Sequence, residues 1–147
     1  MIDRLTRIAA PLSALALVFA AGTGVAQEAA NVQVTFTGIS QQTGAIYGGI
    51  YDSEAAFNQG KSVRSFRIDV TGAEAGQAIE GLAPGRYAIK VFHDVDGDGR
   101  MGTNPFGMPL EPYAASNNAK ANMGPPTWTD AVFEVTAEGA VQVITLN

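Results

Sequence analysis

The feature that most limits what this chain can fold into is a series of short segments in which apolar and polar residues alternate. In residues 31–38, polar residues separate Val32, Val34 and Phe36. A period of two is typical of a half-buried strand rather than a helix. The pattern predicts about seven short strands and no long helix, which together favour an all-β fold with two packed sheets. The predicted strands are residues 31–38, 45–51, 63–70, 77–82, 86–94, 131–136 and 141–146.

Turn residues predict how these strands are joined. Residues 41–44 predict a hairpin between the first two strands, and residues 137–140 predict a hairpin between the last two. Gly48 and Gly49 predict a bulge or a close backbone approach within their strand. Pro-Gly within residues 82–87 predicts a tight turn into the following strand. This turn resembles the one in transthyretin-like and carboxypeptidase-regulatory-like sandwiches.

We therefore expect a single antiparallel β-sandwich of immunoglobulin-like or prealbumin-like type, with one long ordered loop. Asp52 or Ser53 is expected to cap a short helical turn over residues 54–57, which Gly60 ends.

The first 26 residues are typical of a secretory signal peptide. Arg4 and Arg7 precede an apolar run that is too short to span a bilayer, and cleavage is expected after Ala26. The alternative is a retained membrane anchor. The sequence thus predicts a secreted or periplasmic domain over residues 27–147, with no membrane span in the mature chain.

The net charge limits the kinds of partner that the chain can bind, and the absence of cysteine limits how it can be stabilised. The chain has 9 Lys and Arg against 14 Asp and Glu, a net charge of −5. Such an acidic surface repels phosphate backbones, so we expect no nucleic-acid partner. The chain has no cysteine, so an exported domain of this sequence depends on its core, or on a bound ion, for stability.

Three aspartates lie at alternate positions near the middle of the chain: Asp94, Asp96 and Asp98. Like charges this close are destabilising unless water or a cation neutralises them. Gly97 and Gly99 give the backbone the freedom to curl, and Asp-x-Asp-x-Asp-Gly is also how a calcium-binding loop begins. The pattern predicts a Ca²⁺ site.

The rest of this loop departs from the EF-hand. Arg100 stands where a backbone carbonyl binds the ion, but Gly102 and Pro105 stand at the later ligand positions. Downstream oxygens must therefore complete the site, and Asn104 and Glu111 are the candidates. The alternative is a solvated turn without an ion, since Asp and Gly are common turn residues.

A long segment without periodicity follows, from residue 99 to residue 129. Loops of this length are uncommon in compact domains and are usually functional or disordered. Its apolar residues argue against disorder. Phe106, Tyr113 and Trp128 are candidates for an aromatic ligand-binding surface, although each could instead cover the end of the sandwich.

His93 is the only histidine and falls on the core-facing side of its predicted strand. The plainer interpretation is a hydrogen-bonded side chain that closes the core. The alternative is a role in binding, either of a ligand or of a transition metal beside the aspartates. The oxygen-rich surroundings favour Ca²⁺ over Zn²⁺.

The stretch from His93 to Asn118 resembles the signature of a bacterial exported family, domain of unknown function 2141. The matching strings are residues 93–100, 103–104, 106–109, 111–113 and 116–118, together with the turn at residues 82–87. The resemblance implies a small β-sandwich of unassigned activity. The family pattern often has asparagine at two of the three Asp positions and an acidic residue at the position of Gly102. Either the additional aspartates of this chain replace that ligand or the ligand set differs.

The sequence favours a binding role over catalysis. It has no cysteine nucleophile and no Gly-x-Ser-x-Gly motif, and a carboxylate pair such as Asp98 and Glu111 is too common to indicate a hydrolase. We expect an exported, non-catalytic binding module for a carbohydrate or protein ligand of the envelope or the extracellular space. The alternatives are a structural component of the cell envelope without an ion, and a metal-dependent hydrolase.

Overall fold

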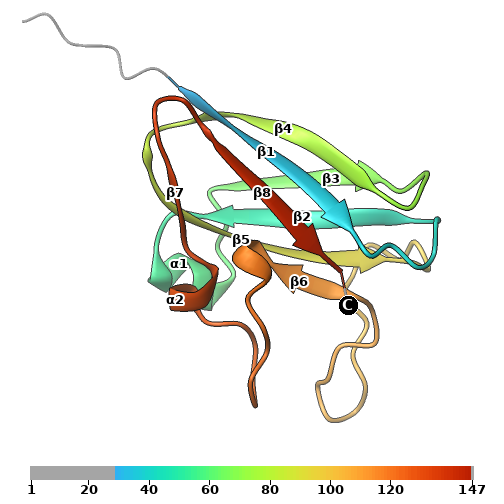
Figure 1. Ribbon diagram of the computed structural model, residues 1–147. Helices are drawn as coiled ribbons and strands as arrows, with labels where there is room; N and C mark the ends of the chain where they lie inside the picture. The colour runs from blue at the N-terminus through green and yellow to red at the C-terminus, as the bar shows by residue number, and fades with distance from the viewer. Residues whose placement is uncertain (1–28, 147) are drawn as a thin grey trace, which may run out of the picture.

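The computed structural model describes residues 29–146, which form two packed β-sheets (Figure 1). The predicted signal peptide, residues 1–26, lies outside the described residues. Among those described, no helix has the length and apolar character needed to cross a membrane.

The smaller sheet has three strands in the order β4-β1-β8. Its central strand, β1 (Ala30–Thr37), pairs antiparallel with β4 (Ala75–Leu82) and parallel with β8 (Ala140–Thr145). The alternation in β1 directs Val32, Val34 and Phe36 into the core, as the sequence predicts. The parallel β1–β8 pair departs from the fully antiparallel arrangement we expected.

The larger sheet contains β3 (Arg64–Asp69), β2 (Ala45–Tyr51), β5 (Gly85–Asp94) and β6 (Tyr113–Ala115), in that order. The short strand β7 (Phe133–Val135) also pairs with the beginning of β5. The predicted sandwich is confirmed, with eight strands in the described residues rather than about seven. The additional strand is β6, which lies within the long segment that has no sequence periodicity.

The predicted hairpin between the first two strands is wrong, and the one between the last two is reduced to a tight turn closed by one bridge. β1 and β2 lie in opposite sheets, because Ile39 in the connection between them is buried in the core and the chain crosses from one layer to the other. Likewise, β7 pairs with β5 whereas β8 pairs with β1, and only the bridge between Thr136 and Gly139 joins the two segments.

The main core fills the space between the inner faces of the sheets. Phe36 of β1 stacks on Phe66 of β3, with 6.2 Å between ring centroids. The Phe66 ring lies against Gly48, where an added Cβ would be 2.1 Å from the ring. The pairing of β2 is regular, so Gly48 allows a close approach rather than a bulge. Fully buried members of this core include Phe36, Ile46, Ile50, Ile89 and Ile144.

A second apolar cluster lies on the outer face of the larger sheet, where Tyr51 of β2 and Ala88 of β5 are neighbours. Helices α1 (Glu54–Gln59) and α2 (Trp128–Ala131) lie side by side there (Figure 1). Ser53 caps α1 and Gly60 ends it in the left-handed conformation, as predicted.

A 3₁₀ turn, η1 (Ser116–Asn118), follows β6 directly and connects both sheets. The buried Ser116 hydroxyl accepts a hydrogen bond from the Ile89 amide at 2.9 Å and donates one to the Ala131 carbonyl at 2.5 Å. The Asn118 side chain accepts a hydrogen bond from the Thr145 amide, at 2.7 Å, and donates one to the Val143 carbonyl. This turn therefore ties β5 and α2 to the edge strand β8.

Candidate metal site

The acidic turn begins with Asp94, the last residue of β5, whose side chain is buried. Its carboxylate accepts hydrogen bonds from the backbone amides of Gly97, Asp98 and Gly99, at 2.8, 3.2 and 2.9 Å. Gly97 and Gly99 have φ angles of 78° and 76°, a left-handed conformation that favours glycine. The chain therefore curls around the Asp94 carboxylate, as the two glycines predict.

Asp96 and Asp98 are exposed and each stabilises the turn locally. Asp96 Oδ1 accepts from the Asp98 amide at 3.1 Å, and Asp98 Oδ1 accepts from the Arg100 amide at 2.8 Å. These bonds to the amide two residues further on are the Asx turns that aspartate favours.

Glu111 returns to this turn from the other end of the long loop. Its Oε1 accepts from the Val95 amide at 3.0 Å, and its Oε2 accepts from the Gly102 amide at 2.9 Å. The segment is held beside β5 because the His93 amide donates to the Pro112 carbonyl at 2.8 Å. The Glu111 carboxylate thus joins the end of the long loop to its beginning.

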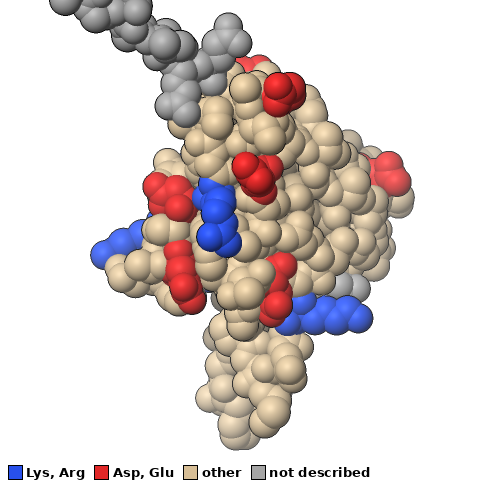
Figure 2. Space-filling view, turned by 60° about the vertical axis from the view of Figure 1, so that its left-hand side comes forward, with Lys and Arg blue, Asp and Glu red and all other residues tan. Residues whose placement is uncertain are grey.

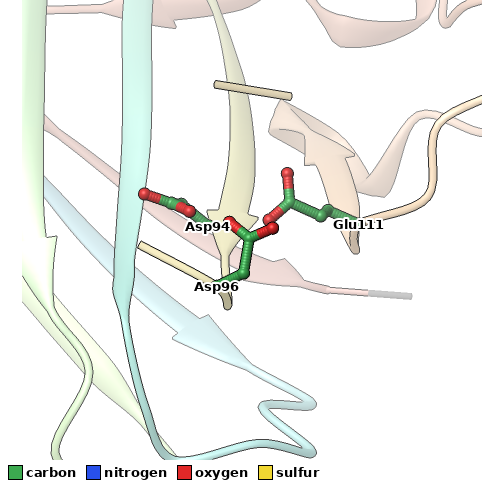
Figure 3. A group of neighbouring side chains, drawn as sticks. All are labelled: Asp94, Asp96 and Glu111. Atoms are coloured by element: carbon green, nitrogen blue, oxygen red, sulfur yellow. The ribbon is translucent and has the colours of Figure 1, made fainter. Parts of the chain in front are cut away.

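The structure brings together three of the predicted ligands. Asp94, Asp96 and Glu111 each offer a carboxylate oxygen, and these oxygens lie within 4.8 Å of one another. Figure 3 shows Asp96 and Glu111 facing each other, with Asp94 beside them at the end of β5. In residues 29–146 the only side-chain ion pair joins Arg67 to Asp69, so no Lys or Arg side chain is paired with these three carboxylates. Three clustered anions of this kind would gain from a hard cation.

The other predicted ligands have different surroundings. Asp98 is not part of this group of three. Arg100 is exposed, and its amide is hydrogen-bonded to Asp98. Asn104 Oδ1 accepts from the amides of Phe106 and Met108, at 2.9 and 3.0 Å. Asn104 therefore shapes the tip of the loop.

His93 is buried and donates its Nε2–H to the Thr43 carbonyl, across 2.7 Å. This contact joins the end of β5 to the turn before β2. It matches the plainer interpretation, a histidine that closes the core by hydrogen bonding, and His93 is not in the acidic group.

The three aromatic candidates do not form one surface. Phe106 is 88% exposed at a loop tip, and Tyr113 is half-buried on β6. Trp128 is only 8% exposed and packs edge-on against Phe57, with 5.8 Å between centroids. Trp128 therefore belongs to the second apolar cluster, which corrects its place in the predicted ligand-binding surface.

The sequence analysis missed a groove of about 950 Å³ on the outer face of the larger sheet. Residues of β2, β5 and β6 line it together with two loop segments, and Tyr113 is the only aromatic candidate among them. The sequence does contain an indication of this groove. Residues 101–110 and 121–129 have no charged residue and carry several methionines, which is typical of an apolar surface.

Comparison with known proteins identifies the family but no closer relative. Residues 34–143 match the family described as "Uncharacterized protein conserved in bacteria (DUF2141)". No curated protein and no solved structure matches the chain, so the likeness to transthyretin-like sandwiches is not confirmed. Because the match spans most of the two sheets and the whole acidic loop, the chain belongs to the DUF2141 family.

Proposed function

We propose that this chain is an exported, non-catalytic binding module whose acidic turn holds a Ca²⁺ ion. The observation that carries the proposal is the convergence of Asp94, Asp96 and Glu111 within 4.8 Å. These residues come from the two ends of one loop, so an ion between them would join those ends. Export is proposed from the sequence of residues 1–26 alone.

Calcium suits this group better than other common ions. All three side chains offer oxygen, and the chain has no cysteine. Ca²⁺ accepts six to eight oxygens in flexible geometry, whereas Mg²⁺ requires near-ideal octahedral geometry. Waters or backbone carbonyls of the turn would supply the remaining ligands.

A binding role is favoured over catalysis because the chain offers few catalytic groups. It has no cysteine nucleophile, and its one histidine is buried and bonded to a backbone carbonyl. A metal-dependent hydrolase would need a base close to metal-bound water, and His93 is not in the acidic group.

A structural envelope component without an ion is the second candidate. It is favoured by the hydrogen bonds within the turn, because Asp94, Asp96 and Glu111 all accept bonds from backbone amides. Those bonds could hold the turn in shape without a cation.

Calcium titration of the purified protein, followed by its melting temperature, separates the two candidates. An ion at 100 times its Kd adds about 2.7 kcal/mol, which raises Tm by about 10 °C for a domain of this size. Asp96→Asn should abolish most of this shift because it removes one of the three converging carboxylates. Asp98→Asn is the matched control, since Asp98 is also exposed but lies outside the group.

A parent protein whose Tm is the same in excess Ca²⁺ and in EDTA would overturn the calcium proposal and favour the structural alternative. Equal losses in the two variants would place the ion elsewhere in the loop.

A further inference from the structure

The groove lies outside the acidic group and has walls of unusual composition. Its floor is the outer face of the larger sheet, contributed by Tyr47, Tyr51, Lys90, Phe92, Tyr113 and Ala115. Its walls come from two loop segments, the first contributing Met101 and residues 107–109 and the second Ala121 and residues 123–126. Both segments project beyond the sheets at the lower side of the molecule (Figure 1).

These walls are apolar although they are exposed to solvent. Met101, Met108 and Met123 line the groove, and no charged residue occurs in residues 101–110 or 121–129. Figure 2 shows the lower projection free of charged side chains on the face in view, in contrast to the body above it. Flexible, polarizable methionines are typical of surfaces that adapt to apolar ligands.

Lys90 is the only charged residue that lines the groove. Its ammonium donates to the Phe57 carbonyl at 2.5 Å and lies over two rings, 3.8 Å from the Phe57 centroid and 5.3 Å from that of Tyr51. No carboxylate of residues 29–146 forms an ion pair with it. Burial lowers the pKa of Lys90, which is the expected cost of a cation in an apolar setting.

The groove therefore offers an apolar space with one unpaired positive charge on its floor. Its volume of about 950 Å³ lies within the range of about 300–1,000 Å³ found for small-molecule sites. A complementary ligand has an apolar body that fits between sheet and loops, and a single negative group that reaches Lys90.

We propose that this groove binds a small amphipathic anion of the fatty-acid type, with its alkyl chain against the methionine-bearing loops and its carboxylate on Lys90. The inference supplies a ligand class for the binding role proposed above and rests on that role. It uses none of the residues of the calcium site, so the two proposals can fail separately.

Isothermal titration of the full protein with decanoate below its micellar concentration and with decan-1-ol below its solubility limit tests the role of the charge. Decanoate should bind at least about tenfold more tightly than the alcohol, as expected for one charge-assisted contact. Lys90→Met should remove this preference while retaining affinity for the alcohol. Lys61→Met is the matched control, because Lys61 is exposed and does not line the groove.

A second pair of variants tests the location and remains informative if Lys90→Met fails to fold. Met108→Asp places a negative charge on the groove wall and should weaken decanoate binding at least about tenfold. Phe106→Asp alters the same loop at an exposed position that does not line the groove, and should bind decanoate like the parent protein.

Three results would overturn the proposal: no decanoate binding by the parent protein, undiminished binding by Lys90→Met, or equal losses in the two loop variants. Sedimentation with phosphatidylcholine vesicles, without binding of free decanoate, would also overturn it and assign the apolar loops to a lipid surface. Repeating the titration with Asp96→Asn separates the sites, because decanoate binding should survive loss of the calcium ligand.

Discussion

At the scale of single residues, two glycines, one in the acidic turn and one facing it, are required for different reasons. Gly97 is left-handed, with φ of 78°, and has no atom within 4 Å of the place where a Cβ would lie. Gly44 is also left-handed, but there a Cβ would lie 1.9 Å from the Asp94 carbonyl oxygen. Position 97 needs glycine only for its left-handed backbone angle. Position 44 needs it for that angle and also because a Cβ would collide with the Asp94 carbonyl.

Urea unfolding of Gly97→Ala and Gly44→Ala should separate these two requirements. Gly97→Ala should lower the free energy of unfolding by about 1–2 kcal/mol, the cost of a left-handed L-residue. Gly44→Ala should cost clearly more, because its Cβ also displaces the end of β5. Equal losses would mean that the Asp94 backbone moves aside without cost.

The buried Ser116 hydroxyl permits a second test at this scale. Ser116→Ala leaves the Ile89 amide and the Ala131 carbonyl without that partner, so the free energy of unfolding should fall by about 1–3 kcal/mol. Ser65→Ala is the matched control, because Ser65 is exposed and bonds only to the Ser62 hydroxyl. A similar, small loss in both variants would argue that the hydroxyl does not join η1 to β5.

At the scale of elements, β5 organises the molecule. It pairs with β2, β6 and β7, ends in His93 and Asp94, and carries Lys90 on its outer face. The metal site therefore lies at the end of β5, and the groove lies along the outer face of the same strand. Helices α1 and α2 cover the other part of this outer face through the second apolar cluster.

Trp128 reports directly on this cluster, because it is the only tryptophan in the chain. Its fluorescence should be poorly quenched by iodide, since its side chain is buried against Phe57. Phe57→Ala should increase the quenching and cost about 3–5 kcal/mol of stability. Phe106→Ala makes the same change at an exposed position and should alter neither. Strong quenching in the parent protein would contradict this packing.

At the scale of the whole molecule, two features act together: an acidic chain without cysteine and a sandwich whose two layers are joined by crossing connections. Stability must come from the core and from links such as that of Arg64, which donates to the Glu80 carbonyl between the edge strands of the two sheets. A bound cation would add to these links and raise the free energy of unfolding, so calcium binding should be measurable as a higher melting temperature.

Export is tested at this scale too. Expressed in a bacterium with an intact secretion pathway, the mature protein should begin at Gln27, as mass spectrometry of the periplasmic fraction or the medium would reveal. Ala26→Leu should block or shift cleavage, because signal peptidase reads small residues there. A full-length protein beginning at Met1 in the membrane fraction would instead support a retained anchor.

Local features of this fold could be predicted well. The strand containing Val32, Val34 and Phe36 and the cap at Ser53 follow from neighbouring residues. Strand pairing could not be predicted, because the connection at Ile39 gains more by entering the core than by turning back. The choice between a buried and a ligand-binding Trp128 could not be made for the same reason, since only the docking of α2 beside α1 buries it.

The sequence by itself determined the alternation, the caps, the curl of the acidic turn and the family, because each depends on residues close in the chain or on a specific string. The tertiary structure alone decided that Glu111, and not Asp98, joins Asp94 and Asp96, and that Lys90 lies in an apolar groove with no carboxylate partner among residues 29–146. These relations join residues from different strands and loops. They are set by how two sheets pack, which no local pattern encodes.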